Sequence, residues 1–182
     1  WKGLVGSEMC IRDSLYPNSK LTIGPPIENG FYYDVDFQNS TFSENDFSKI
    51  ENKMIEEARK DHCFEMREIS NSDALSYYEK QKNEYKCELI KGLGNEKITF
   101  CDHANFTDLC KGGHIPSTKF IKSVKLLNTA GAYWRGDENN KQLTRIYGIS
   151  FPKEKLLKEY LQLLEEAKKS CLLYTSDAAD DG

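Results

Sequence analysis

The sequence predicts an α+β fold with a mainly antiparallel sheet packed with helices, followed by a C-terminal linker helix. Residues 44–60 repeat apolar side chains at helical spacing. Residues 98–149 instead contain several β-rich stretches in which apolar and polar residues alternate. Helices early in the chain and strands later favour segregated elements over repeated βαβ units. No internal repeat, low-complexity tract or linker divides residues 30–150, so we expect a single domain with its own core.

The first elements follow a turn-rich segment. Residues 22–36 hold two prolines and two glycines and then alternate aromatic with acidic side chains, which predicts a loop leading into a strand at about 30–36. Ser43 with Asp46 three residues later is a helix-start signal, so a helix is expected over 44–60. The apolar face of this helix would consist of Phe47, Ile50, Met54 and Ala58.

The middle of the chain continues with short elements. The pattern of residues 64–69 predicts a short strand, and Ser70 with Asp73 marks the start of a second helix near 73–81. The pattern then changes from helical spacing to alternation. Further β-rich stretches are 98–101, 106–110, 120–127 and 143–149.

A last helix is predicted from Pro152, a residue that suits the first turn of a helix. Its apolar stripe consists of Leu156, Tyr160, Leu163, Leu164 and Ala167. No apolar run reaches the length of a membrane span, so we expect no membrane contact.

The two ends of the chain resemble translated DNA adapter. The segment Cys171–Ser176 can be encoded by TGTCTCTTATACACATCT, and the reverse complement of that string lies within a coding sequence for Glu8–Ser14. We therefore expect residues 1–14 and 171–182 to be adapter artefacts, one domain at 15–150 and a linker helix at 151–170. Without those ends, 23 basic residues face 24 acidic ones, so overall charge excludes little.

The cysteines outside these ends suggest a reducing compartment. Cys63, Cys87, Cys101 and Cys110 have no regular spacing and no secretion signal precedes them, so we expect free thiols in a cytoplasmic protein.

Candidate chemistry is concentrated in the heptapeptide from Asp108 to His114. It combines a carboxylate, the Cys110 thiol, two glycines at 112 and 113 and an imidazole. Alternation along a strand places Asp108 and Cys110 on one face. Three interpretations stay open: two ligands of a metal site, a nucleophilic Cys paired with His, or a hydrolase in which these groups orient a water molecule. The structural alternative is a buried thiol beside a histidine that binds a loop carbonyl.

Two other groups could contribute ligands. Cys101 and His103 are two residues apart on an expected strand and face one way, and His62 and Cys63 follow the first helix. Neither group has a specific spacing relative to Cys110. The favoured interpretation is that Cys101 is a small buried apolar residue and His62 a surface cation at a helix end.

A basic stretch follows the heptapeptide. Phe120, Tyr133 and Trp134 lie among its basic residues, a mixture that single-stranded nucleic-acid surfaces use. An ordinary solvated sheet face explains the same pattern, and taken alone the charge favours that explanation. The basic residues are Lys111, Lys119, Lys122, Lys125, Arg135, Lys141 and Arg145, against Asp137 and Glu138.

A series of motifs resembles the editing domain of bacterial-type threonyl-tRNA synthetases, with the second additional domain that threonyl and alanyl enzymes share. In family order they are LYPNSKLTIGPPIENGFYYDVDF, EYKCELI, FTDLCKGGHIPST, KLLNTAGAYWRGDENNKQLTRIYG and a closing LEEAKK. The resemblance covers residues 15–169, essentially all of the chain apart from its adapter-like ends.

The resemblance implies hydrolysis of the ester in threonine-specific tRNA that has been mischarged with serine. The catalytic residues it implies are Lys86, Asp108, Cys110 and His114, with Tyr33, Gly112 and Gly113 binding substrate. Asp108 would hold the amino group or hydroxyl of the seryl group, and Lys86 would position water or the terminal ribose. Cys110 and His114 would line the pocket and help to order water.

The resemblance also sets expectations for the parent enzyme. No cofactor is expected in this segment, whereas ATP, magnesium and zinc would belong to a catalytic domain that this chain lacks. The partner would be tRNA, and the parent would be a homodimer through that catalytic domain. The alternatives are a free-standing editing hydrolase and a non-catalytic RNA-binding module.

Two departures from the family pattern bear on activity. The family has His-x-x-x-His just before the position of Leu15, where this chain has adapter-like sequence, so we expect impaired catalysis. The loop reads Cys-Lys-Gly-Gly-His where Cys-Arg-Gly-Pro-His is common, so Lys111 loses the bidentate fork of arginine and Gly113 loosens the turn.

Overall fold

Two antiparallel sheets with helices against them form the described part of the chain. The computed structural model describes residues 15–28, 30–94, 97–104, 106–110, 112 and 116–177, without the side chains of 170–177. The larger sheet has the order β1-β3-β8-β7, with β2 pairing to the other end of β3, and the smaller has the order β4-β5-β6. This confirms the predicted α+β class. The strands of the larger sheet are β1 (Lys20–Leu21), β2 (Pro26–Ile27), β3 (Gly30–Asp36), β7 (Ser123–Tyr133) and β8 (Gln142–Phe151); those of the smaller are β4 (Glu65–Ile69), β5 (Ile98–His103) and β6 (Phe106–Leu109).

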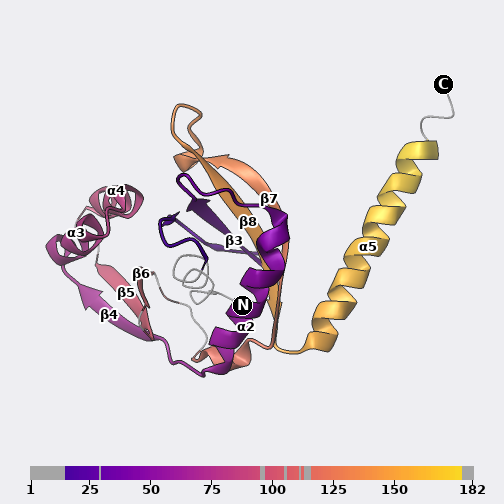
Figure 1. Cartoon of the computed structure of the whole chain (residues 1–182), viewed down its shortest axis with the longest axis horizontal. Coiled ribbons are helices and arrows are strands. Elements are labelled where there is room, and N and C mark those ends of the chain that lie inside the picture. Colours follow the sequence, from indigo (N-terminus) through magenta and orange to yellow (C-terminus); the bar gives the residue numbers. More distant parts are fainter. Residues whose placement is uncertain are drawn as a thin grey trace.

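The helices divide between the two sheets (Figure 1). Helix α2 (Phe47–Arg59) lies against the larger sheet, while α3 (Asn71–Lys80) and α4 (Glu84–Leu93) pack side by side against the smaller one. Each sheet therefore has its own apolar core. Helix α4 also contacts residues of the larger sheet, so it links the two sheets.

The core of the larger sheet is built as predicted. The chain enters α2 through a short 3₁₀ helix at Glu44–Asp46, and the Ser43 backbone N–H donates to the Asp46 carboxylate at 3.2 Å. The four residues of the predicted apolar face are buried, with Ile50 fully so. The prediction of a helix over 44–60 is confirmed as these two continuous elements.

The core of the smaller sheet holds one element that sequence reasoning missed. Helix α3 begins as predicted, since the Ser70 hydroxyl accepts a hydrogen bond from the Asp73 backbone N–H at 3.1 Å. Helix α4 was not predicted. Its buried residues are Tyr85, Cys87 and Ile90 together with Lys86, so a charged residue interrupts the apolar period.

The long hairpin β7–β8 also extends beyond its prediction. The expected strand over 120–127 begins as a 3₁₀ helix at Thr118–Phe120, and β7 then continues to Tyr133. Residues 130–132 are alanine and glycine, which are weak strand formers, but each pairs in register with β8. Pairing with β8 therefore outweighs the low strand propensity of residues 130–132.

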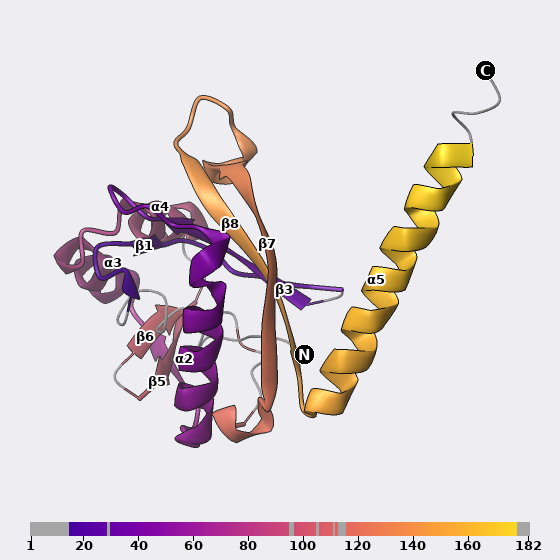
Figure 2. The same ribbon diagram turned by 45° about the vertical axis from the view of Figure 1, so that its right-hand side comes forward.

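The C-terminal helix α5 (Glu154–Asp177) projects away from the sheets (Figure 2). Its first turns pack on the hairpin, where Leu157 is buried and the Tyr160 ring lies 5.5 Å from that of Phe151. Further along, Leu163 is 63% exposed. Among the described helices, none is both long and apolar enough to cross a membrane.

Candidate active site

A buried ion pair between Lys86 and Asp108 is the centre of the site. Lys86 lies in the first turn of α4, and its Nζ is 2.8 Å from Oδ1 and 2.9 Å from Oδ2 of Asp108 on β6. The two residues are only 3% and 5% exposed. Taking two charges out of water costs several kcal/mol per ion unless further hydrogen bonds hold them. The surrounding residues provide such bonds.

Tyr78 holds the carboxylate from the other side. Its hydroxyl donates to Asp108 Oδ1 at 2.8 Å and accepts from the Leu109 backbone N–H at 2.7 Å. Burial, reinforced by the nearby Asp108 carboxylate, raises the pKa of the Tyr78 hydroxyl far above its usual range. The hydroxyl therefore stays protonated and remains a donor, which fixes the orientation of the carboxylate. No sequence motif pointed to Tyr78.

Helix α4 is itself tied to the larger sheet. The Tyr85 hydroxyl donates to the buried Asp36 carboxylate at 2.6 Å, and the Trp134 indole N–H donates to Glu88 at 2.9 Å. The Tyr85 and Trp134 rings meet edge to face at 5.1 Å. Lys86 thus lies on a helix that is held by β3 and the β7–β8 hairpin on one side and by Asp108 on the other.

Cys110 follows β6 and extends its pairing with β5. Its backbone N–H donates to the Thr99 carbonyl at 3.0 Å, and the Gly112 N–H lies 3.2 Å from its half-buried sulfur. Because Cys101 pairs with Asp108 in this register, alternation places Asp108 and Cys110 on one face, as predicted. Gly112 has φ +90°, a conformation that favours glycine.

The remaining members of the predicted site are placed differently. Gly113 and His114 lie outside the described residues. Tyr33 lies on β3, in the core of the larger sheet, where its ring covers Gly24 so closely that a Cβ there would be 1.9 Å from Cδ2 of the ring. Tyr33 and Asp108 belong to different sheets, and the role of Tyr33 in binding substrate stays a prediction.

His103 and His62 form a contact that sequence reasoning did not anticipate. Their ring centroids are 5.2 Å apart and nearly perpendicular, and Phe64 stacks on His103 at 4.8 Å. His62 is half-buried just past the end of α2, and its interpretation as a cation at a helix end stays a prediction. The interpretation of Cys101 as a small buried residue is confirmed, since it has no exposed surface.

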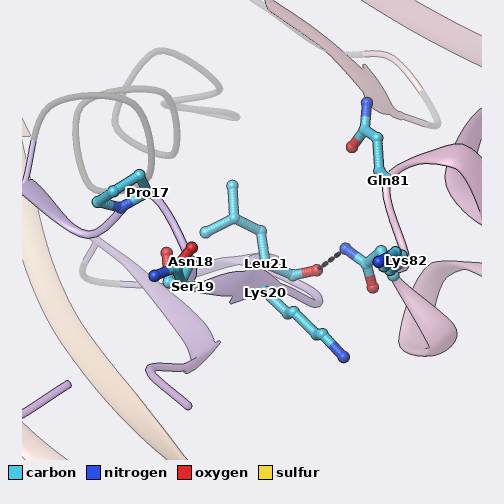
Figure 3. Close-up of a pocket in the computed structure, with 8 residues that line it drawn as sticks. Pro17, Asn18, Ser19, Lys20, Leu21, Gln81 and Lys82 are labelled. Carbon is cyan, nitrogen blue, oxygen red and sulfur yellow. Dashed lines mark hydrogen bonds between the residues drawn. The ribbon is translucent and has the colours of Figure 1, made fainter. Parts of the chain in front are cut away.

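A polar cavity of ≈ 440 Å³ adjoins the start of α4 (Figure 3). Asn83 joins its two walls, because its amide donates to the Leu21 carbonyl at 2.9 Å while its Oδ1 caps α4 by accepting from the Lys86 N–H at 3.2 Å. The cavity therefore lies one helical turn from Lys86. It is lined by Pro17, Asn18, Ser19, Lys20, Leu21, Gln81, Lys82 and Asn83.

The basic stretch is largely neutralised by carboxylates from other elements. Five of its seven cations are in ion pairs, so within the described residues the stretch does not form the free positive surface considered above. Lys111 lies outside the described residues. The pairs are Lys119–Asp61, Lys125–Glu51, Arg135–Glu88, Lys141–Asp36 and Arg145–Asp34.

Potential metal ligands do not gather in the part of the chain that the structure covers. No group of three or more His, Cys, Asp or Glu side chains there could hold an ion. The described site is built on an ion pair and hydrogen bonds.

Comparisons with known proteins show which family this sequence resembles. Residues 98–147, which include Asp108 and Cys110, match the family described as the threonyl and alanyl tRNA synthetase second additional domain. The threonine–tRNA ligase of Flavobacterium psychrophilum is 58% identical over 159 residues, 87% of this chain and 24% of the relative. The chain is homologous to a segment of the threonine–tRNA ligases.

Other relatives of the same description support the assignment. The threonine–tRNA ligase of Flavobacterium johnsoniae is 60% identical over 157 residues, and that of Clostridioides difficile is 55% identical over 156 residues. These matches cover 86% and 85% of this chain and 24% of each relative. The chain thus spans about a quarter of the length of the relatives it matches. The resemblance inferred from the sequence motifs is confirmed.

Proposed function

We propose that this chain is the editing segment of a threonine–tRNA ligase and that it hydrolyses the ester of threonine-specific tRNA mischarged with serine. The observation that carries the proposal is the buried Lys86–Asp108 pair beside Cys110, in a segment homologous to those ligases. Buried ion pairs are costly, and one next to a thiol on a sheet face is a better candidate for a functional site than for a stabilising device.

The chemistry of the pair suits an aminoacyl ester. The amino group of the seryl moiety is a cation at neutral pH, and the Asp108 carboxylate is the group present that can accept hydrogen bonds from it. The Lys86 ammonium has three donors, so while bound to Asp108 it can also stabilise negative charge that develops on the ester oxygen. Cys110 would line the same pocket.

The need for such a site follows from the substrates. Serine lacks one methyl group of threonine, and a missing methyl in a binding pocket yields only about 1–3 kcal/mol of discrimination. A second site that hydrolyses the ester therefore removes seryl-tRNA after it has formed. The proposal extends to the parent enzyme. We propose that the parent attaches threonine to tRNA with ATP, magnesium and zinc, that it is a homodimer and that it is cytoplasmic.

The alternative of a non-catalytic RNA-binding module has less support. It depended on the basic stretch, and most of those cations are paired with carboxylates in the fold. A free-standing editing hydrolase would use the same residues and differs only in what adjoins this segment.

The proposal is tested in a complete enzyme. Residues 15–169 would replace the homologous segment of the Flavobacterium psychrophilum ligase, and release of serine from seryl-tRNA would be compared with release of threonine from threonyl-tRNA. We expect preferential release of serine, reduced at least about 100-fold by Lys86→Met or Asp108→Asn.

The matched control is Lys97→Met. Lys97 pairs with Glu68, but their side chains are 79% and 65% exposed, so the same chemical change occurs at a solvated ion pair instead of a buried one. This variant should release serine at the unsubstituted rate. A graft that charges threonine normally and releases serine no faster than buffer does would contradict the proposal.

A further inference from the structure

Tyr78 binds the open edge of the smaller sheet. Strand β6 is last in the order β4-β5-β6, so one of its edges has no partner strand among the described residues. The Cys110 N–H bonds to the Thr99 carbonyl of β5, and backbone groups alternate in direction along a strand, so the Leu109 N–H points to the open edge. The Tyr78 hydroxyl accepts from this N–H at 2.7 Å. Tyr78 therefore supplies the acceptor that a further strand would otherwise provide.

The same hydroxyl ties the Asp108 carboxylate to the strand backbone. It donates to Oδ1 of Asp108 at 2.8 Å, so its one proton is used for this bond. The Tyr78 ring is 2% exposed and packs edge-on against the rings of Tyr77 and Phe100, with centroids 5.0 and 5.6 Å away. Because the ring is buried and its proton is used, Tyr78 has no donor left for a substrate, and an effect of its hydroxyl on the reaction passes through Asp108.

Asp108 in turn determines where the Lys86 ammonium lies. Lys86 Nζ is 2.8 Å from Oδ1 and 2.9 Å from Oδ2, and among the described residues this ammonium has no other hydrogen-bond or ion-pair partner. Lysine carries its charge on a flexible stem of four carbons, so the position of the ammonium depends on its partner. Two contacts to the carboxylate leave at least one of the three N–H donors for a ligand. A carboxylate held in one orientation therefore sets the direction of the remaining N–H.

We propose that Tyr78 is a positioning residue of the editing site, which acts through Asp108 to direct the Lys86 ammonium toward the ester. The inference rests on the proposed function and adds to it a residue that does not touch the substrate. Negative charge develops on the ester oxygen in the transition state, where a fixed ammonium stabilises it most. Loss of the Tyr78 hydroxyl should therefore lower kcat and leave KM nearly unchanged.

Tyr77 provides a matched control on the same helix and strand. Its hydroxyl donates to the Thr107 carbonyl of β6 at 3.3 Å. Tyr77→Phe and Tyr78→Phe therefore each remove one phenol hydroxyl between α3 and β6, and of the two only the Tyr78 hydroxyl bonds to Asp108 in the described fold. If these hydroxyls merely held α3 against β6, both variants would affect the reaction alike.

The test measures kcat and KM for serine release by the grafted ligase described above. We expect Tyr78→Phe to lower kcat about 10- to 100-fold with KM changed less than about twofold, and Tyr77→Phe to leave both within about twofold of the unsubstituted values. Threonine charging should be unchanged in both. Each variant is also assayed with sucrose, which favours the compact folded state. A loss caused by partial unfolding would recover in sucrose, whereas a loss caused by a misdirected ammonium would persist.

The outcomes separate this inference from the proposed function. A kcat loss that is specific to Tyr78→Phe and persists in sucrose supports the positioning role. If the unsubstituted graft releases serine and Tyr78→Phe does so at the same kcat, loses no more than Tyr77→Phe, or recovers in sucrose, the positioning role is wrong and the editing function stands. If the unsubstituted graft charges threonine but releases no serine, the proposed function fails and this inference fails with it.

Discussion

Removing one partner of the Lys86–Asp108 pair should destabilise the fold more than removing both. In Asp108→Asn the Lys86 side chain loses its carboxylate partner in a site that is 3% exposed. Uncompensated buried charges of this kind cost about 3–5 kcal/mol. Lys86→Met leaves a buried carboxylate that Tyr78 still contacts at 2.8 Å, so its cost should lie at the lower end of that range.

The double variant measures the coupling between the two charges. Lys86→Met with Asp108→Asn removes both, so its loss should be smaller than that of Asp108→Asn alone and well below the sum of the single losses. Urea unfolding of the full chain, followed by far-UV circular dichroism, measures all three. With a slope of about 2 kcal/mol per molar urea, the Asp108→Asn midpoint should fall by roughly 1.5–2.5 M.

The exposed pair Lys97–Glu68 supplies the reference. Lys97→Met should change stability by about 0–1 kcal/mol, as exposed ion pairs do. If each single substitution at the buried pair costs under about 1 kcal/mol and the double variant is additive, then Lys86 and Asp108 are solvated in solution. The account of a preorganised, water-excluded pair would then be wrong.

Three further predictions concern stability and are measured by the same unfolding assay. Gly24→Ala should cost roughly 1–3 kcal/mol or more, because its Cβ would overlap the Tyr33 ring; no loss would mean that the ring does not cover this glycine. The pKa of His103 falls to about 4, so between pH 6.5 and about 4 the unfolded chain binds a proton there that the folded chain does not, and stability should drop by about 3 kcal/mol as pH falls through that window. His103→Phe should remove that part of the acid sensitivity, and an unchanged pH profile would contradict the buried neutral imidazole. Arg145→Lys should cost about 1.5–3 kcal/mol, because an ammonium cannot reproduce the two bonds of 2.7 and 2.8 Å to Asp34, and a silent substitution would argue against that bidentate pair.

Elements with strong local signals could be predicted from the sequence. The start of α3 is an example, because the Ser70 cap and Asp73 are three residues apart and need no tertiary partner. The strand at 30–36 was predicted at its observed bounds for a similar reason. Helix α4 was missed because Lys86 occupies an inward position that a periodicity argument reserves for an apolar residue.

The site shows the same division between local and distant information. Asp108 and Cys110 could be identified as candidate site residues because they lie together in one glycine-rich motif. Lys86 is 22 residues before Asp108 and Tyr78 is 30 residues before it, so only the resemblance pointed to Lys86 and nothing pointed to Tyr78. The approach of His62 to His103 likewise depends on how α2 and β5 pack, which no spacing along the chain encodes.

The most direct test of the central claim is the rate of serine release from seryl-tRNA specific for threonine by the grafted ligase, with and without Asp108→Asn. The account predicts rapid release of serine, slow release of threonine, and a loss of at least about 100-fold in the variant while threonine charging continues. Equal rates for the unsubstituted enzyme and Asp108→Asn would contradict it.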